Sequence, residues 1–302
     1  MPSVEHDLVM DVMRAEQEAL AGRPPPTVAE QRASYERIAE IWPVPGDVSI
    51  VAVEVAGRPA EWVAAPGARD DRAVLYLHGG GYVIGSLATH RDLAARISRA
   101  SASRVLLLDY RLAPEHRFPA AVEDALAAYR WLLARGHDPR RLAVAGDSAG
   151  GGLALVTLVG LRDAGDRLPA AAVCLSPWTD LALSGGSMQS RAGADPAIDR
   201  ATLQRWAGHY LAGGDPRQPL ASPLYADLSG LPALLVLVGT AEILLDDAAR
   251  VAQRAAAAGV EVVYEPWPDL GHVFAAYAGT PEAGQAAALI AAFLASHWSE
   301  AP

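Results

Sequence analysis

The segment of this sequence with the clearest chemical meaning is Gly146-Asp147-Ser148-Ala149-Gly150, which follows the apolar run 142–145 and precedes a helical stretch. A G-x-S-x-G sequence between a strand and a helix is typical of a nucleophile elbow, a sharp turn that exposes the serine hydroxyl. Glycines two positions before and after the serine let strand and helix approach closely, and the helix N-terminus favours developing negative charge. We therefore predict that Ser148 is a nucleophile; the alternative is a glycine-rich turn with a helix-capping serine.

A second glycine-rich segment, His78-Gly79-Gly80-Gly81, directly follows the apolar run 73–77. Successive glycines expose backbone N–H groups with no side chain in the way, which is what an oxyanion hole requires. The alternatives are a flexible turn or a phosphate-binding loop. Neither nucleotide-binding glycine motif can be read here, because Ile84 stands where a third glycine should be and the chain has no lysine. We expect His78 to make structural hydrogen bonds.

His272 is the best candidate for a general base. It lies in Gly271-His272, in a loop after the apolar run 260–265. It therefore comes after the serine and after any acid that lies between them, which is the chain order of a serine–acid–histidine triad in this kind of scaffold. The other histidines fit this order less well. His6 and His297 lie near the termini, His137 lies in a polar turn, and His90, His116 and His209 follow no late strand.

The acid of such a triad should follow a strand that lies between the serine and the histidine. Glu242 does so, just beyond the apolar run 233–238, where a parallel sheet presents side chains to a site. The alternative for Glu242 is a first-turn helix glutamate that complements the helix dipole. The competing carboxylates, which are less well placed, are Asp246, Asp247 and Asp269.

From residue 73 onward, short apolar runs alternate with helical stretches. The expected strands are 73–77, 104–109, 142–145, 171–175, 233–238 and 260–265, and the expected helices are 91–102, 120–135, 150–164, 246–258 and 282–298. Strands that are apolar without alternation, with helices between them, indicate a mostly parallel sheet with helices on both faces. Before them, 49–55 and 61–65 predict an antiparallel hairpin with its turn at Gly57-Arg58-Pro59.

Two segments do not fit this alternation. Residues 1–45 read as a helical arm, which Pro24-Pro25-Pro26 interrupts before a second short helix over 28–41. Residues 180–230 separate two strands by far more than a usual connection and contain a helical stretch around 201–211. We interpret 180–230 as an insertion that lies over a site, within a catalytic domain that spans 46–302.

Composition excludes several classes of protein. Of the 302 residues, 51% are hydrophobic and 20% are charged, which suits a large core and argues against disorder. The formal net charge of -10 repels phosphate, so we expect no nucleic-acid partner. All 25 basic side chains are arginines, which excludes a lysine nucleophile or Schiff base. The single cysteine, Cys174, excludes an intrachain disulfide.

We expect no metal, no cofactor and no membrane span. The histidines are scattered and no H-E-x-x-H motif is present, and no apolar stretch reaches the roughly 18 residues of a span. Five acidic residues within the first 21 are wrong for a secretory signal. The expected location is therefore the cytoplasm.

Four motifs together resemble the hormone-sensitive-lipase family of α/β-hydrolases, the bacterial esterases marked by an H-G-G motif. The motifs are His78-Gly79-Gly80-Gly81-Tyr82, Asp109-Tyr110-Arg111-Leu112-Ala113-Pro114-Glu115, Gly146-Asp147-Ser148-Ala149-Gly150-Gly151 and Gly271-His272. The similarity spans roughly residues 70–298. It implies an α/β-hydrolase fold with a helical cap, to which residues 1–45 and about 180–230 both contribute.

The resemblance also implies a chemistry. The expected protein is a serine carboxylesterase that hydrolyses short-acyl esters through an acyl-enzyme intermediate, with a small-molecule ester as its partner and no cofactor. Many members carry aspartate where Glu242 stands. Many also dimerise through the edge of the sheet, so the resemblance implies a homodimer. The implied triad is Ser148, Glu242 and His272, and the implied oxyanion-hole residues are Gly80, Gly81 and Ala149.

The substrate stays open at this point. A lactone hydrolase or a deacetylase would use the same triad, and residues 242–247 resemble the branch that includes monoterpene lactone hydrolases. A non-catalytic small-molecule receptor on this fold is the remote alternative. Loss of the triad histidine would favour it, but serine, acid and histidine are all present here. For substrate binding we expect Tyr82 and two bulky side chains of the insertion helix, Trp206 and Tyr210.

Overall fold

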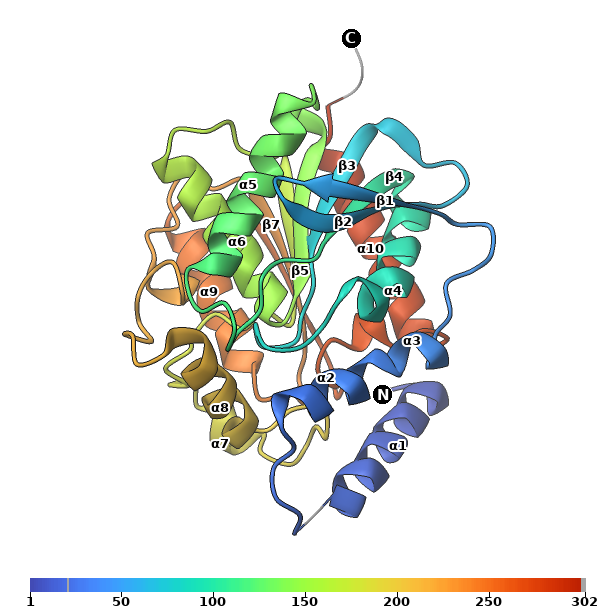
Figure 1. Cartoon of the computed structure of the whole chain (residues 1–302), viewed down its shortest axis with the longest axis vertical. Coiled ribbons are helices and arrows are strands. Elements are labelled where there is room, and N and C mark those ends of the chain that lie inside the picture. Colours follow the sequence, from blue (N-terminus) through green and yellow to red (C-terminus); the bar gives the residue numbers. More distant parts are fainter. Residues whose placement is uncertain (21, 300–302) are drawn as a thin grey trace.

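The computed structural model describes residues 1–20 and 22–299. Its centre is an eight-stranded sheet in the order β1-β2-β4-β3-β5-β6-β7-β8 (Figure 1). The strands are β1 Ser49–Val55, β2 Arg58–Ala64, β3 Arg69–Leu77, β4 Ser103–Leu108, β5 Leu142–Asp147, β6 Ala171–Leu175, β7 Ala233–Gly239 and β8 Val262–Trp267. β2 pairs antiparallel with β1 and β4, and every other neighbouring pair is parallel. The expected α/β class with a mostly parallel sheet is confirmed.

Helices cover both faces of this sheet, as Figure 1 shows. α4 (Leu87–Ser101) and α10 (Pro281–His297) pack on one face, and α5 (Ala120–Ala134), α6 (Ala149–Asp163) and α9 (Leu245–Ala257) on the other. Along β3, Val74 and Tyr76 pack into the core beneath α4 and α10, whereas Leu75 and Leu77 pack into the core beneath α5, α6 and α9. Because successive side chains of a strand point to opposite faces, a strand buried on both sides must be apolar throughout.

The first hairpin corrects one expectation. Val55 pairs with Arg58, so the turn consists of Ala56 and Gly57 alone. Both have positive φ, 51° and 80°, which is the backbone of a two-residue hairpin turn that matches strand twist. The predicted turn at Gly57-Arg58-Pro59 is therefore wrong, because Arg58 and Pro59 already belong to β2.

The N-terminal arm forms α1 (Val4–Leu20), α2 (Val28–Glu36) and α3 (Ile38–Ile41), so the single helix expected over 28–41 is two helices. The backbone N–H and hydroxyl of Ser3 bind the carboxylate of Glu282 in α10. Arg32 of α2 reaches the carbonyl oxygens of Val83 and Ala113. These contacts seat the arm on the body that carries the sheet.

Between β6 and β7 the chain forms α7 (Ser187–Ser190), α8 (Arg200–Leu211) and the 3-10 turn η2 (Pro223–Tyr225). Figure 1 places α7 and α8 at the same end of the sheet as α1–α3. The remaining 3-10 turns are η1 (Pro139–Arg141) and η3 (Phe274–Ala276). Within residues 1–20 and 22–299, no helix combines the length and apolarity that crossing a membrane requires.

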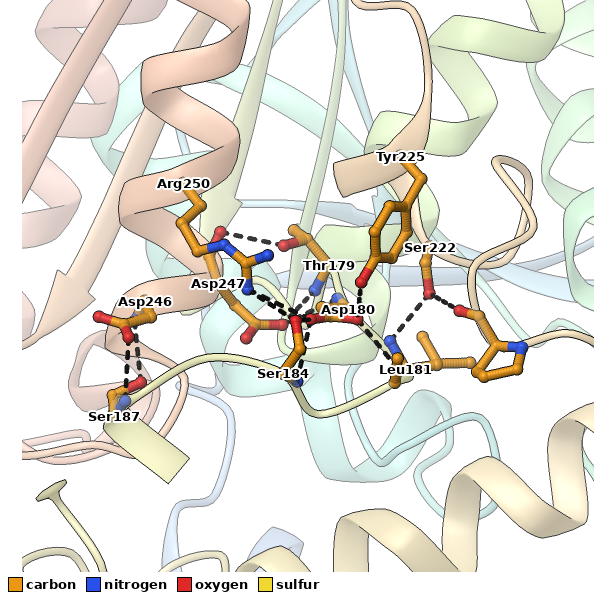
Figure 2. Close-up of polar contacts among 12 residues, drawn as sticks. Thr179, Asp180, Leu181, Ser184, Ser187, Ser222, Tyr225, Asp246, Asp247 and Arg250 are labelled. Carbon is orange, nitrogen blue, oxygen red and sulfur yellow. Dashed lines mark hydrogen bonds and ion pairs between the residues drawn. The ribbon is translucent and has the colours of Figure 1, made fainter. Parts of the chain in front are cut away.

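A buried polar network ties this insertion to the first turn of α9 (Figure 2). One oxygen of the Asp247 carboxylate accepts the backbone N–H groups of Thr179 (2.9 Å) and Asp180 (2.8 Å). The Asp180 carboxylate in turn accepts the hydroxyl of Tyr225 at 2.9 Å and faces the guanidinium of Arg250 at 3.2 Å. The start of the insertion, its 3-10 turn and α9 are thus held at one point.

Candidate active site

The two glycine-rich motifs meet at the carboxyl ends of neighbouring strands. The chain leaves β3 for β4 on one side and then returns to β5 on the other side of β3. Ligand sites of open α/β sheets lie at such a reversal of strand order, outside the carboxyl ends of the strands. His78-Gly79-Gly80-Gly81 follows β3, and Ser148 follows β5.

Ser148 sits on the strained turn that its motif predicts. Its φ of 51° and ψ of -121° place it outside the usual regions for a residue with a side chain, directly before α6. The two glycines of the motif are sterically required. A Cβ on Gly146 would lie 2.3 Å from the carbonyl oxygen of Gly150, and one on Gly150 would lie 1.9 Å from that of Leu77.

The structure brings Ser148, His272 and Glu242 into one hydrogen-bonded chain. Nε2 of His272 lies 2.9 Å from Ser148 Oγ, and Nδ1 lies 2.5 Å from Glu242 Oε2. Oε1 of the same carboxylate accepts the hydroxyl of Ser176 at 2.6 Å and the N–H of Gly239 at 2.8 Å. A carboxylate held at Nδ1 fixes the tautomer that leaves Nε2 free to accept the serine proton.

Burial and charge act in opposite directions on the histidine. Burial lowers the pKa of His272, but the charge and hydrogen bond of Glu242 outweigh it, so the pKa of His272 is raised above its ordinary value. Burial raises the pKa of Glu242, against the opposing effects of His272 and Ser176. Ser148, His272 and Glu242 are 6%, 9% and 0% exposed, so the acid end of this chain of groups is fully buried and the serine end is largely so.

The competing carboxylates lie elsewhere. Asp246 binds the backbone N–H of Ser187 at 2.9 Å, and Asp247 binds those of Thr179 and Asp180. Asp269 is exposed. Of the four carboxylates considered from the sequence, Glu242 alone contacts the imidazole of His272.

The expected oxyanion-hole residues have free donors. Within residues 1–20 and 22–299, no protein acceptor binds the backbone N–H of Gly80, Gly81 or Ala149. Gly80 and Gly81 have φ of 110° and 61°, and a Cβ on Gly81 would lie 2.1 Å from the ring of Trp206. Glycine is thus needed both for the backbone conformation and for the close approach.

Asp147, the second residue of the serine motif, holds the glycine-rich loop 78–81. Its buried carboxylate accepts the N–H of Gly79 at 3.0 Å and the hydroxyl of Tyr76 at 2.8 Å, with His90 Nε2 at 3.3 Å. Burial raises the pKa of Asp147, but the charge and hydrogen bond of His90 outweigh burial, so the pKa lies below its ordinary value. The sequence analysis missed this role, although the residue lies inside a motif it singled out.

His78 is structural, as expected. Its ring stacks on Tyr110 with centroids 4.2 Å apart, and its Nδ1 lies 2.8 Å from the carbonyl oxygen of Gly79. Burial is the largest cause that lowers the pKa of His78, to about 3. A ring that stays neutral and enclosed supports the loop rather than the reaction.

A cavity of about 360 Å³ opens onto Ser148 and His272. Its walls come from both segments that interrupt the α/β alternation, as well as from the catalytic body. The lining includes Met13, Tyr35 and Trp42 of the arm, Ile198 and Trp206 of the insertion, and Gly80. The arm residues are a part of this wall that the sequence analysis did not name, because helical spacing alone does not tell which face meets a site.

Two of the three expected substrate-binding residues do not line this cavity. Trp206 does, with its indole N–H donating to Gln31 of the arm at 2.9 Å. Tyr82 and Tyr210 stack face to face, with centroids 4.0 Å apart, and each is 1% exposed. They join the core beneath the insertion helix, so their predicted contact with substrate is corrected to a packing role. In the part of the chain that the structure describes, no cluster of three or more His, Cys, Asp or Glu side chains could hold a metal ion.

Comparison with known proteins places this geometry among ester hydrolases. Residues 74–276 match a family described as having the alpha/beta hydrolase fold. An acetyl-hydrolase of Streptomyces hygroscopicus is 47% identical over 299 residues, 97% of each chain. The crystal structure of an esterase from the bacterial hormone-sensitive lipase family has 51% identity and a TM-score of 0.94, over 99% of this chain and 100% of that one. The esterase EstE5, soaked with p-nitrophenyl butyrate, has 44% identity and a TM-score of 0.94 over 99% and 100%.

Proposed function

The chain belongs to the α/β-hydrolase family, among the hormone-sensitive-lipase-like ester hydrolases, and on this premise we propose that it cleaves short-acyl carboxylic esters through an acylated Ser148. The observation that carries the proposal is the hydrogen-bonded chain from Ser148 through His272 to Glu242. Ser148 and His272 of this chain line a cavity, and the N–H groups of Gly80, Gly81 and Ala149 have no protein acceptor among the described residues.

The proposed reaction has two halves. Ser148 Oγ attacks the ester carbonyl carbon while His272 Nε2 takes its proton, and the N–H groups of Gly80, Gly81 and Ala149 bind the resulting oxyanion. His272 then gives the proton to the leaving alkoxide, and the alcohol departs from an acyl-serine. In the second half, His272 takes a proton from water, the hydroxide attacks the acyl carbon, and Ser148 recovers the proton as the acid leaves.

The same proposal covers the domain organisation. We assign residues 1–45 and about 180–230 to a cap over the catalytic domain 46–302. The support is that Trp42 and Met13 from the first segment and Trp206 from the second line the cavity that holds Ser148. Residue 21 of the arm lies outside the described residues.

The direct test is Ser148→Ala. Because Ser148 carries the one hydroxyl among the described residues that hydrogen-bonds to His272 Nε2, turnover of p-nitrophenyl butyrate should fall by up to about 10⁶-fold while the fold persists. Wild-type protein should also be labelled stoichiometrically by an organophosphate, and Ser148→Ala should not. Esterase activity that survives in a clean Ser148→Ala preparation would refute the proposal.

Short acyl chains should be preferred over long ones. A cavity of about 360 Å³ is at the small end of ligand pockets, and bulky aromatic side chains of the arm and insertion line it. We expect kcat/KM on p-nitrophenyl esters to peak at C4 or shorter and to fall at C12. A higher kcat/KM at C12 would show that the cap opens further than this structure implies.

Deacetylation is a second candidate that one observation favours. The relative with 47% identity over nearly the whole chain is called an acetyl-hydrolase. The carbonyl oxygen of an acetyl group would occupy the same oxyanion site. The assay panel should therefore include acetylated amines and sugars and a few lactones beside the simple esters. Turnover of any of these that exceeds that of p-nitrophenyl acetate would identify the subtype.

We further propose a homodimer and a cytoplasmic location. The dimer is supported by the position of β8 at an edge of the sheet, where unpaired strand groups can meet a second copy. The location is supported by a single cysteine, Cys174, which is buried and makes no disulfide. Light scattering after size exclusion and cell fractionation test the two proposals separately.

A further inference from the structure

Three consecutive backbone N–H groups at His272 donate to side chains rather than to backbone. Gly271 donates to Nε2 of His6 at 3.2 Å, and Val273 donates to Ser176 Oγ at 3.0 Å. Between them, the N–H of His272 itself donates to Asp195 Oδ2 at 2.5 Å. The position of the imidazole therefore depends on side chains from three separate parts of the chain.

Two of these three side chains come from the segments assigned to the cap. His6 belongs to α1, and Asp195 lies in the loop between α7 and α8. They are only 1% and 2% exposed. By contrast Ser176 follows β6 and also binds Glu242, so it belongs to the sheet side of the site.

The Asp195 contact connects the cavity wall to the base. Its second oxygen accepts the N–H of Ala197 at 2.8 Å, and residues 196–198 line the cavity. One carboxylate thus holds the wall of the cavity on one side and the backbone of His272 on the other.

His6 supports the same loop from the arm. Its ring lies 5.9 Å from that of Tyr277, and the Tyr277 hydroxyl donates to the carbonyl oxygen of His272 at 2.7 Å. To accept the N–H of Gly271, His6 must have an unprotonated Nε2. Its other ring nitrogen, Nδ1, lies 3.8 Å from Asp7.

We propose that Asp195 and His6 are positioning residues, through which the two cap segments hold the His272 loop in the geometry that activates Ser148. The proposal rests on the function proposed above and adds that the seating of the cap and the readiness of the base are coupled. Neither residue touches the reacting atoms; each acts through the backbone beside His272.

The physical reason is the cost of leaving this loop unsupported. Without Asp195, the buried N–H of His272 loses its acceptor, and the loop must shift to find another. A displacement of about 1 Å at a catalytic group can cost about 10²-fold in rate. Burial lowers the pKa of His272, and the Glu242 carboxylate raises it most; the carboxylates of Asp195 and Asp147 raise it further.

The experiment compares Asp195→Ala and Asp195→Asn with wild type. We expect kcat on p-nitrophenyl butyrate to fall about 10- to 100-fold in Asp195→Ala, with a smaller change in KM. Asparagine keeps one of the two acceptor oxygens that Asp195 uses, whereas alanine keeps neither. The loss of kcat should therefore be smaller in Asp195→Asn than in Asp195→Ala. In both variants the acid limb of the kcat/KM profile should move to lower pH, because a negative charge near His272 is gone.

A matched control exists in the same insertion. Asp199 accepts the N–H of Thr202 at 2.6 Å at the start of α8, which is the same kind of contact without His272. Asp199→Ala should leave kcat and the acid limb unchanged even where it lowers Tm. A purely structural role for Asp195 would give the Asp199 pattern, and that result would overturn the proposal.

His6 is tested by rescue. His6→Gln keeps an acceptor near the position of Nε2, whereas His6→Phe keeps the bulk and removes the acceptor. We expect His6→Gln to retain most of kcat and His6→Phe to lose about 10-fold. Equal kcat in the two variants, both folded by circular dichroism, would contradict the role of His6.

The controls separate this proposal from the function it rests on. If wild type turns over esters and Ser148→Ala does not, the function stands, and unchanged kcat in Asp195→Asn and Asp195→Ala then refutes positioning alone. If Ser148→Ala stays active, the function itself is wrong. Should Asp195→Ala fail to fold, Asp195→Asn decides the question, because it preserves the shape of the side chain.

Discussion

Glu242 is held from two directions, and this explains how its long side chain presents a carboxylate oxygen to His272 in one fixed position. Ser176 and the N–H of Gly239 fix one carboxylate oxygen, which leaves the other aimed at His272 Nδ1. The side chain is fully buried, so its extra methylene brings no freedom of movement. Its charge therefore acts on the imidazole at a fixed distance.

Glu242→Gln should reduce kcat/KM by up to about 10⁴-fold, because the amide cannot stabilise the imidazolium as a carboxylate does. Free His272 must be unprotonated to accept the serine proton, so activity rises as pH passes through its pKa. The Glu242 carboxylate raises that pKa, and its loss should move the acid limb of kcat/KM to lower pH. A pH–rate profile of both proteins measures the shift.

The controls for this prediction are Asp246→Asn and Asp269→Asn. Neither carboxylate contacts the imidazole, so both variants should keep kcat/KM within a few-fold of wild type. A larger loss in either than in Glu242→Gln, with all proteins folded by circular dichroism, would show that the acid has been misassigned.

At the scale of elements, local pattern predicted most of the fold. Runs such as 171–175 became strands with the expected bounds, because an unbroken apolar run must be buried on both faces. The hairpin turn was misplaced because Pro59 looks like a turn residue. In the structure it pairs with Glu54 inside β2, and the actual turn uses Ala56 at positive φ, which alanine seldom adopts.

Site residues could be predicted where a local motif determines the backbone conformation, but not where contacts between distant parts of the chain determine the position of a side chain. The sequence of Ser148 and the glycines around it predicts a strained turn, which the structure contains. Asp195 and His6 lie in no motif, and their contacts with the His272 loop join residues 77 and 265 positions apart. Tyr210 was expected at the substrate because it shares a helix with Trp206, but packing turns its ring onto Tyr82 instead.

Replacing a glycine by alanine should have opposite effects on stability at the elbow and in an exposed helix. Gly150→Ala places a Cβ against the carbonyl oxygens of Leu77 and His78, at 1.9 and 2.5 Å, where only backbone can move. It should lower the free energy of unfolding by about 1–3 kcal/mol or more. Gly284→Ala, in the exposed part of α10 with no atom within 4 Å of the new Cβ, should raise it by about 0.5–1 kcal/mol.

Urea denaturation of the two variants measures both effects. Because Gly150 lies two residues after Ser148, Gly150→Ala should also lose esterase activity, whereas Gly284→Ala should keep it. If Gly150→Ala unfolded at the same urea concentration as wild type, the close approach of strand and helix at the elbow would be refuted.

At the scale of the whole molecule, we expect the network in Figure 2 to make the stability of the fold depend on pH. Asp180 and Asp247 are both fully buried, and the nearest guanidinium, that of Arg250, is partly exposed. Burial, and then the charge of Asp180, raise the pKa of Asp247 well above its usual value. One Asp247 oxygen, Oδ1, has no hydrogen-bond partner among the described residues.

The sign of the consequence follows from proton binding. Folded protein holds a proton on Asp247 at pH values where the unfolded chain, with an aspartate pKa of about 3.9, has released it. Stability from this group is therefore greatest at low pH and falls as pH rises from about 4 towards the raised pKa of Asp247. Near neutral pH, the fold must retain that proton or bury a second charge beside Asp180.

Asp247→Asn should remove this dependence. The amide oxygen of asparagine can still accept the N–H groups of Thr179 and Asp180, while no proton has to be held. We expect the variant to have a higher Tm than wild type at pH 8 and a Tm close to it at pH 4, measured by differential scanning calorimetry. Asp246→Asn is the matched control: its half-buried carboxylate binds Ser187, and its Tm difference from wild type should not widen with pH. A Tm difference for Asp247→Asn that is equal at both pH values would mean that Asp247 is already ionised in the folded protein.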